Sequence, residues 1–241
     1  MRVVLRLKPT NEKCIALPQH YNHLVQSAIY SSISPSLSKF LHESGFLYGK
    51  RSFKLFTFSR LFGRYQLLGS KILFEDHIEL WISSPIKKFI EDIANFILKR
   101  GYMMIGNDKL CVTEIIFPKE PNISQRVKIR MLSPVTVYST LYTREGNKKT
   151  YYYSPYEKDF SRLINENAKK KFYVLEGKKL KSYMKISPIR VRECVSMYKR
   201  TVIKGWYGEF SLEGPITLIK CVYEAGLGAK NSQGFGMFEV I

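Results

Sequence analysis

The chain is poor in cysteine and has no long hydrophobic run, and these two shortages exclude several classes of protein. Its cysteines are Cys14, Cys111, Cys194 and Cys221, which lie far apart and form no C-x-x-C pair. This spacing argues against a disulfide framework or a cysteine zinc site and is typical of a reducing cytoplasm. No apolar stretch approaches the roughly 18 residues of a membrane-spanning helix. The opening MRVVLRLKP is too short and too charged for a signal peptide and predicts a strand. We therefore expect a cytoplasmic protein without a membrane partner.

Acidic residues are also scarce. The 241 residues include 20 Asp and Glu against 39 Lys and Arg, which gives a formal net charge of +19. The excess is spread out, because residues 1–120 carry 17 basic against 10 acidic side chains and residues 121–241 carry 22 against 10. With 45% hydrophobic residues the chain can form a globular core. Such a surplus favours a polyanionic partner, above all nucleic acid, with an anionic membrane or simple solubility as alternatives.

The two halves of the chain show the same order of predicted elements. In the first half, the segments MRVVLRL, FKLFTFS, HIELWIS and KLCVTEIIF predict strands, and Pro18 to about His42 and PIKKFIEDIANFILKR predict helices. In the second half, RVKIRML, YMKISPIRVREC, YKRTVIKGWYGEFSL and GFGMFEVI predict strands, and SPYEKDFSRLINENAKKKF and PITLIKCVYEAG predict helices. The proline-containing segment PKEPNISQ between the halves predicts a linker.

Each half thus follows a β-α-β-β-α-β plan, which is that of a ferredoxin-like fold. We predict an α+β protein of two tandem ferredoxin-like (RRM-like) domains, residues 1–120 and 121–241. In each domain we expect helices on one face of an antiparallel sheet, with the other face free to bind.

The C-terminal segment EAGLGAKNSQGFGMFEVI contains four glycines, Gly226, Gly228, Gly234 and Gly236. They follow a helix and precede a strand, whereas phosphate-binding loops run from strand to glycines to helix, so we expect no nucleotide cofactor. One interpretation is structural, with a helix end and a bulged entry into a strand. The other is a concave run of backbone N–H groups that binds an anion, with Lys230 adding charge and Asn231 and Ser232 donating hydrogen bonds. The spacing alone leaves both open.

This pattern of G-hydrophobic-G, five residues including a basic one, and G-hydrophobic-G resembles the C-terminal signature of the RAMP superfamily, the RNA-binding proteins of CRISPR systems. The segments LPQHYNHLVQSAIYSSIS, FLHESGF and KLFTFSRL resemble one branch of it, the endoribonuclease that cuts precursor CRISPR RNA within its repeats. The resemblance runs from the first strand to the last. It implies two tandem ferredoxin-like domains and a glycine loop that contacts RNA near the cleft between them. Because members can lose activity and keep binding, a non-catalytic RNA-binding subunit of a CRISPR effector is the alternative function.

The resemblance also implies a metal-independent reaction run by Tyr30, His42 and Lys54, which match the motif positions. In a helical projection Tyr30 falls outside the apolar half, and His42 points away from the apolar stripe of a second helix that begins at Pro35 with Ser34 as its cap. The 2′-OH of RNA would attack the neighbouring phosphate and leave a 2′,3′-cyclic phosphate and a 5′-OH. We predict His42 as the general acid and Lys54 as the stabiliser of negative charge.

The role of Tyr30 stays open between general base and positioner of the 2′-OH, because an unperturbed pKa of about 10 leaves roughly a thousandth of it ionised at pH 7. Lys50 and Arg51 are rival cations, and His20 and His23 are rival histidines. The acidic residues show no two-metal constellation, so we expect no metal and no other cofactor.

Further basic residues alternate with apolar ones on two predicted strands. Lys128 and Arg130 do so in RVKIRML, and Arg190 and Arg192 in SPIRVREC. These faces are either a phosphate track or an ordinary solvated surface. The run KKK at 169–171 is interpreted as peripheral charge, and the tyrosines at 151–153 as candidates for base stacking with at least one in the core. The expected partners are a precursor CRISPR RNA repeat and, secondarily, proteins of a CRISPR effector complex, while the oligomeric state is open between monomer and homodimer.

Overall fold

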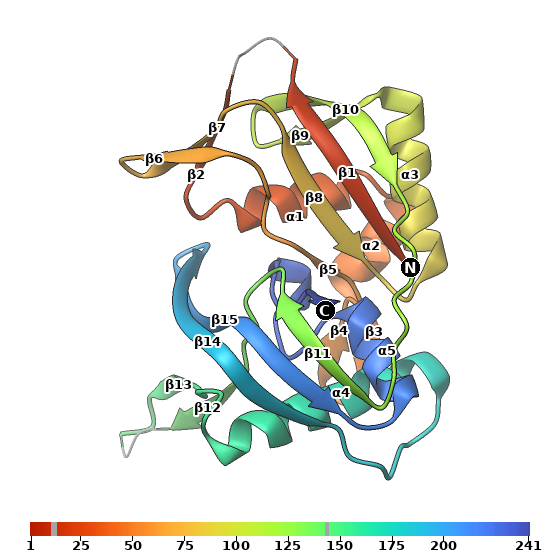
Figure 1. Ribbon diagram of the computed structural model, residues 1–241, viewed down its shortest axis with the longest axis vertical. Helices are drawn as coiled ribbons and strands as arrows, with labels where there is room; N and C mark the ends of the chain where they lie inside the picture. Colours follow the sequence, from red (N-terminus) through yellow and green to blue (C-terminus); the bar gives the residue numbers. More distant parts are fainter. Residues whose placement is uncertain (11–13, 143–144) are drawn as a thin grey trace.

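A computed structural model describes residues 1–10, 14–142 and 145–241 and has two main antiparallel sheets (Figure 1). The first half contains the strands β1 (Arg2–Pro9), β2 (Ile15–Pro18), β3 (Phe46–Tyr48), β4 (Arg51–Phe53), β5 (Thr57–Phe58), β6 (Tyr65–Leu68), β7 (Lys71–Phe74), β8 (Ile78–Ser83), β9 (Tyr102–Ile105) and β10 (Asp108–Ile116), and the helices α1 (Asn22–Tyr30), α2 (Pro35–Glu43) and α3 (Lys87–Arg100). The second half contains the strands β11 (Arg126–Met131), β12 (Tyr138–Tyr142), β13 (Lys148–Tyr152), β14 (Lys185–Tyr198), β15 (Thr201–Glu213) and β16 (Phe238–Val240), and the helices α4 (Lys158–Glu176) and α5 (Ile216–Ala225).

The first sheet has the order β5-β8-β1-β10-β9, and the second has the order β14-β15-β11-β16. In both, the first strand of the β-α-β-β-α-β plan is central and pairs with the third and the last. Figure 1 shows the helices of each half lying behind its sheet. The predicted α+β fold of ferredoxin-like halves is therefore confirmed.

Alternating side chains explain these sheets. Along β11 the residues are exposed and buried in strict turn, so Val127 and Ile129 enter the core while Lys128 and Arg130 face outward. Each half has its own cluster of buried hydrophobic residues. Residues 117–125 form no helix or strand, as the linker prediction requires, and the domain boundary near residue 120 stays a prediction. Among the described residues, no helix has the length and apolarity to cross a membrane.

Two predicted strands are wrong in part. FKLFTFS is not continuous, because Leu55 takes a left-handed conformation with φ of 53° between β4 and β5. GFGMFEVI becomes a strand only at Phe238, since Gly236 is also left-handed, with φ of 81°. The hairpins β3–β4, β6–β7 and β12–β13 were not predicted, and neither were the strands β2 and β9.

The loop of residues 226–236, which we call the glycine loop, joins the two halves. Three side chains of the first half donate hydrogen bonds to its carbonyl oxygens: Asn22 to Gln233 at 2.8 Å, Gln26 to Ser232 at 2.6 Å and Thr57 to Phe235 at 3.0 Å. Arg60 adds a second link, because its guanidinium donates to the Tyr207 hydroxyl at 3.0 Å and to the Ser196 hydroxyl at 2.7 Å. The glycine loop is thus a packed element of the joint.

All four glycines of the loop are buried and have positive φ. A Cβ on Gly236 would lie 2.0 Å from the Leu227 carbonyl oxygen, and one on Gly234 would lie 2.6 Å from Phe58 of the other half. Close packing therefore requires glycine at these positions in addition to the backbone conformation. This observation accounts for the glycines without any ligand.

We expect Gly236→Ala to destabilise the protein by at least about 3 kcal/mol, because the new methyl group would overlap backbone that cannot move freely. Gly101→Ala is the matched control. Gly101 also has a left-handed φ of 72°, but no described atom lies within 4 Å of its Cβ position, so it should cost only about 1 kcal/mol. Urea denaturation of both variants measures the difference, and equal losses would contradict the packing explanation.

Candidate functional site

A break between two helices brings Tyr30 and His42 together. Tyr30 ends α1, Pro35 begins α2, and His42 lies in the last turn of α2. The rings of Tyr30 and His42 meet edge to face with centroids 6.3 Å apart. Ser34 occupies the predicted cap position, but its side chain makes no hydrogen bond to the helix. Its hydroxyl and N–H both donate to the Asp92 carboxylate, at 2.6 and 3.0 Å, and so fix the entry to α2.

Lys54 joins this pair from the segment between β4 and β5. Its ammonium donates to the His42 carbonyl oxygen at 3.3 Å. The left-handed Leu55 produces the bend that follows Lys54, and the Ser84 hydroxyl donates to the Leu55 carbonyl oxygen at 2.8 Å. Tyr30, His42 and Lys54 thus come from three separate segments, with Tyr30 next to the His42 ring and Lys54 at the His42 backbone.

Burial shifts the pKa of two of these groups. The Tyr30 ring packs edge to face on Phe56, with centroids 5.6 Å apart. Burial, followed by the neighbouring Tyr198, raises the pKa of Tyr30 to about 12, so its hydroxyl stays protonated near neutral pH. Burial also lowers the pKa of Lys54. His42 is exposed and accessible to a ligand.

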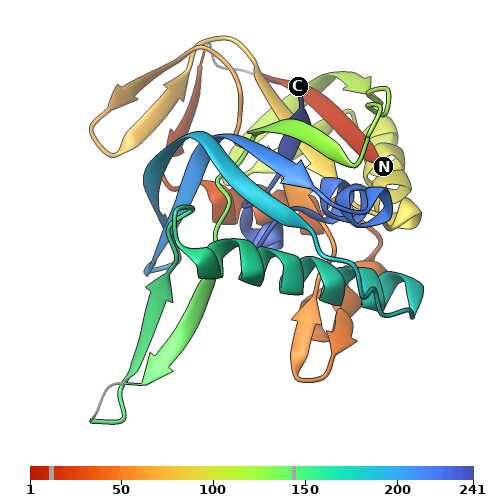
Figure 2. The same ribbon diagram turned by 60° about the horizontal axis from the view of Figure 1, so that its bottom comes forward.

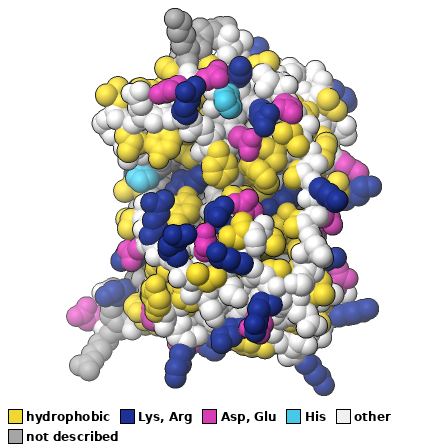
Figure 3. Space-filling model, viewed as in Figure 1, with side chains coloured by type: hydrophobic (Ala, Val, Ile, Leu, Met, Phe, Trp, Pro, Cys, Tyr) yellow, Lys and Arg dark blue, Asp and Glu magenta, His cyan; other side chains and the backbone are white. Residues whose placement is uncertain are grey.

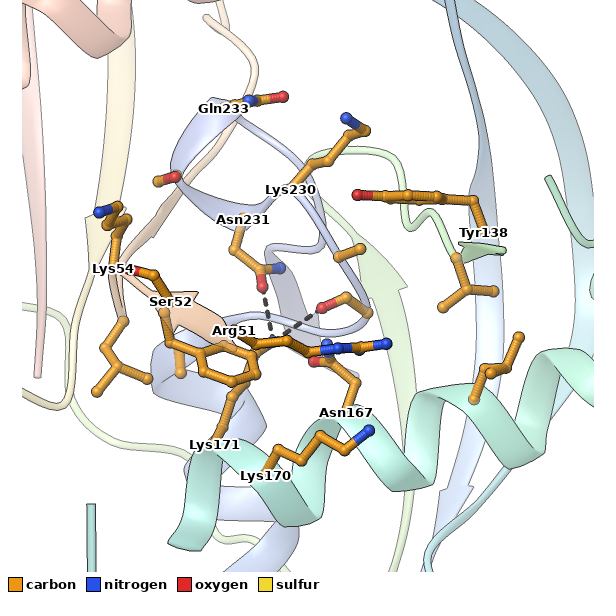
Figure 4. Close-up of a pocket in the computed structure, with 18 of the residues that line it drawn as sticks. Arg51, Ser52, Lys54, Tyr138, Asn167, Lys170, Lys171, Lys230, Asn231 and Gln233 are labelled. Carbon is orange, nitrogen blue, oxygen red and sulfur yellow. Dashed lines mark hydrogen bonds between the residues drawn. The ribbon is translucent and has the colours of Figure 1, made fainter. Parts of the chain in front are cut away.

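A cavity of about 770 Å³ begins at Lys54 and extends between the two halves. Its walls are β4 and the segment that follows it, β12, α4 and the glycine loop. Five Lys and Arg residues line it (Figure 4): Arg51, Lys54, Lys170 and Lys230, and the buried Lys171. The one acidic side chain in the lining, Glu166, is paired with Arg162 at 2.7 Å. The cavity therefore favours an anion of several charges.

The predicted loop residues Lys230, Asn231 and Ser232 line this cavity, while the glycines mostly lie beneath it. Asn231 has an internal role, because its amide donates to the carbonyl oxygens of Leu227 and Phe235 at 2.9 and 3.0 Å. Several loop N–H groups are likewise used inside the protein, such as that of Ala229, which donates to Thr136. The contact of these residues with RNA stays a prediction, and Lys230 is the loop side chain that brings charge to the cavity.

Lys171 was predicted to be peripheral, and this prediction is wrong. It is 2% exposed, and its ammonium donates to the Gly226 and Gly228 carbonyl oxygens at 2.7 and 2.9 Å and to Asn231 Oδ1 at 2.6 Å. Figure 4 shows this side chain rising from α4 beneath the loop. The signal was present in the sequence, because Lys171 continues the buried stripe of Ile164 and Ala168 at helical spacing.

Among the rival candidates, Arg51 lines the cavity, and Lys50, at the turn of the β3–β4 hairpin, does not. His20 and His23 lie at the end of α1 opposite Tyr30, where His20 Nδ1 accepts from the Met197 N–H at 3.3 Å.

The described residues contain no group of three or more His, Cys, Asp or Glu side chains able to hold a metal ion.

The basic residues of the second sheet lie apart from the cavity. Lys128, Arg130 and Arg190 converge on the carboxylate of Glu209, at 2.7, 3.3 and 3.6 Å. Arg192 lies 5.7 Å from the centroid of the Tyr207 ring. Figure 3 shows acidic side chains among the basic ones on this face of the molecule. The predicted RNA-binding residues thus divide between a cavity and a sheet face that carries its own counter-charges.

Comparison with known proteins supports this description. Two family models match the chain, one described as CRISPR-associated protein Cas6, N-terminal, over residues 16–116 and one as CRISPR associated protein Cas6, C-terminal, over residues 118–240. The CRISPR-associated endoribonuclease Cas6 1 of Methanocaldococcus jannaschii is 32% identical over 98% of this chain and 91% of its own length. The chain belongs to the Cas6 family. The resemblance stated from the sequence is thereby confirmed.

Solved Cas6 structures share the whole fold. A CRISPR associated protein Cas6 matches all of this chain and 99% of its own with a TM-score of 0.82 and 29% identity. A Cas6-related protein from Pyrococcus furiosus matches all of this chain and 98% of its own with a TM-score of 0.86 and 26% identity. The likeness thus includes both halves and their arrangement.

We expect Lys171→Met to lower the free energy of unfolding by roughly 3–5 kcal/mol at neutral pH, because three buried oxygens lose their donor. Burial lowers the pKa of Lys171 to about 7 from its usual 10.5. Between these values the unfolded chain binds a proton that the folded chain lacks, so raising the pH opposes unfolding. The wild type should therefore gain on the order of 2 kcal/mol relative to Lys171→Met between about pH 7 and pH 9. Urea denaturation at both pH values tests this, and a pH-independent difference would contradict it.

Proposed function

We propose that this protein is an endoribonuclease that cuts precursor CRISPR RNA within its repeats by a metal-independent transesterification. Three observations support the proposal: membership of the Cas6 family, a relative named as a CRISPR-associated endoribonuclease, and the geometry of the site. The single observation that carries it is that Tyr30 and Lys54 both lie next to His42, while Lys54 also lines a cavity whose walls are rich in cations.

In the proposed reaction the RNA supplies its own nucleophile. The 2′-oxygen bonds to the neighbouring phosphorus and loses its proton to a solvent base, while the bond from phosphorus to the 5′-oxygen breaks. The exposed imidazole of His42 gives a proton to the departing 5′-oxygen, which leaves as a 5′-OH. The other product ends in a 2′,3′-cyclic phosphate. Lys54 stabilises the extra negative charge on the phosphate oxygens as the new bond forms.

Tyr30 positions the substrate in this proposal and does not act as the base. With a pKa raised to about 12 by burial, its hydroxyl is protonated and can donate a hydrogen bond to the phosphate or the 2′-oxygen. The proposed RNA path continues from the three residues into the cavity, along Arg51, Lys170 and Lys230. The residues on the sheet face, Lys128, Arg130, Arg190 and Arg192, would hold a more distant part of the RNA.

The second candidate is an RNA-binding protein of a CRISPR complex that does not cleave. It is favoured by one observation, because two relatives at 28% identity that match all of this chain are named only as endoribonuclease-like. The cationic cavity serves binding equally well in both candidates. Only a cleavage assay separates them.

We expect purified protein to cut a repeat RNA in EDTA and to leave 5′-OH ends. His42→Ala should lower the cleavage rate by roughly 10²–10⁴, the usual contribution of a general acid, and should leave RNA affinity nearly unchanged. His77→Ala is the matched control, because His77 is also exposed but is paired with Asp76 and lies between β7 and β8, on different elements from Tyr30 and Lys54. RNA that stays bound and uncut by the wild type would favour the second candidate. An equal loss of cleavage rate in His20→Ala would instead identify His20, at the other end of α1, as the general acid.

We expect Tyr30→Phe to slow cleavage by roughly tenfold, since one hydrogen bond of about 1–1.5 kcal/mol is lost. Loss of a general base would cost about 10²–10⁴ instead. Because the pKa of Tyr30 is about 12, its ionisation should not shape the rate at neutral pH. The rate profiles of wild type and Tyr30→Phe should therefore run parallel from about pH 6 to pH 9. Profiles that converge at low pH would instead identify Tyr30 as the base.

A further inference from the structure

The β12–β13 hairpin is an addition to the ferredoxin-like plan. It lies between β11 and α4, pairs only with itself, and projects from the body of the molecule, as Figure 2 shows in green. Its strands pair from Tyr138 with Tyr152 to Tyr142 with Lys148. Such a two-stranded projection has little core of its own, so its side chains are available for binding.

One face of this hairpin is aromatic and basic. Because side chains alternate along a strand, Tyr138 and Tyr142 share a face with their cross-strand partners Tyr152 and Lys148. Tyr142 is 67% exposed, and Tyr138 is 37% exposed. The tyrosine rings at the base, Tyr138 and Tyr152, lie 5.7 Å apart, and the Tyr152 hydroxyl donates to Val202 at 3.1 Å, which fixes the hairpin to β15. We call the face made by Tyr138, Tyr142, Lys148 and Tyr152 the hairpin face.

The hairpin face continues directly from the cavity. Tyr138 lines the cavity, and the Lys230 ammonium lies 4.9 Å from the centroid of its ring (Figure 4). Tyr142 follows four residues further along the strand, about 13 Å away. An anionic chain that leaves the cavity past Lys230 therefore meets one tyrosine ring at the base of the hairpin and a second further out, beside the exposed Lys148.

The chemistry of this face fits one kind of occupant. Tyrosine rings provide flat surfaces for bases, and each stacked base typically contributes about 1–3 kcal/mol without regard to sequence. Lysines beside the rings attract phosphates. Paired RNA hides the faces of its bases, whereas an unpaired strand presents them. In the described part of the hairpin, Lys148 and Lys149 outnumber the single acid, Glu145.

We propose that the hairpin face is a stacking track for single-stranded RNA that extends from the cavity. The inference rests on the proposed function, since it takes the RNA in the cavity as its starting point. Tyr138 and Tyr142 stack on unpaired bases of the strand that leaves the cavity, and Lys148 contacts its backbone. The track binds without regard to sequence and lengthens the RNA that the protein holds.

The test compares two polyanions, only one of which has bases. Oligouridylate is an unstructured RNA probe, and heparin carries charge alone. In the His42→Ala background, which prevents cleavage, we expect Tyr142→Ala to raise the dissociation constant for oligouridylate about tenfold and to leave heparin binding unchanged. Tyr142→Trp should retain oligouridylate affinity because a larger ring also stacks. Lys148→Ala should weaken the binding of both probes and reduce the salt dependence.

Tyr156→Ala is the matched control. Tyr156 is 76% exposed but lies outside the hairpin, so its loss should change neither affinity. Unchanged oligouridylate binding by Tyr142→Ala would overturn the proposal, and so would an equal loss for heparin. A wild type that is dimeric in solution, with a monomeric Tyr142→Ala of normal RNA affinity, would assign the face to contact between two copies and would also overturn it.

The experiments distinguish failure of the stacking track from failure of the proposed nuclease function. If the wild type does not cut repeat RNA but Tyr142→Ala still loses oligouridylate affinity, the stacking track stands and only the nuclease proposal falls. If cleavage is normal and Tyr142→Ala binds oligouridylate as the wild type does, the track alone is wrong.

Discussion

One buried ammonium group organises the joint between the two halves. Lys171 Nζ donates to three oxygens of the glycine loop, all within 2.9 Å, and no carboxylate of the described residues forms a salt bridge with it. When Lys171 is protonated, its three donors face three acceptors and satisfy the ammonium. Because burial lowers its pKa to about 7, the folded chain holds the neutral amine, with two donors, at higher pH. The loop carbonyls gain a donor that no neutral aliphatic side chain could supply. The path of the loop, and with it the position of Lys230 at the cavity, depends on this contact.

The same constraint explains the glycines. Some carbonyl groups of the loop accept hydrogen bonds from the buried Lys171, and others accept them from Asn22 and Thr57 of the first half. The loop backbone therefore packs in van der Waals contact with both halves. A side chain has no room there, as the Leu227 carbonyl oxygen at 2.0 Å from the Cβ position of Gly236 shows. Glycine permits the left-handed backbone and the close approach together. The glycine pattern is therefore first a requirement of packing, and its electrostatic contribution to the cavity comes from the lysine between the glycines.

The sequence predicted the parts of the fold and site that depend on local periodicity. The alternation in β11, the helical spacing in α3 and the proline at the start of α2 each act within a few residues, and all three predictions are confirmed. The same periodicity correctly placed His42 on an exposed face of its helix. It was wrong for Tyr30, which is partly buried and packs against the core at Phe56. The roles of both residues stay predictions. What could not be predicted depends on contacts across the chain. Lys171 is charged, but its partners lie 55 or more residues away, and the bend at Leu55 requires a left-handed non-glycine residue that no local pattern indicates.

The basic residues behind the formal charge of +19 differ in how far acidic side chains of the protein neutralise them. On the second sheet, Lys128, Arg130 and Arg190 share the carboxylate of Glu209, so much of their field is already neutralised within the protein. Within the described residues, four cations of the cavity lining form no salt bridge: Arg51, Lys54, Lys170 and Lys230. They also disfavour one another's charge, because burial and the nearby Arg51 lower the pKa of Lys170. A group of cations that repel one another is stabilised most by a ligand with several negative charges. We therefore expect the cavity to bind a polyphosphate chain more strongly than the sheet face does, although the sheet face has the more regular array of basic residues.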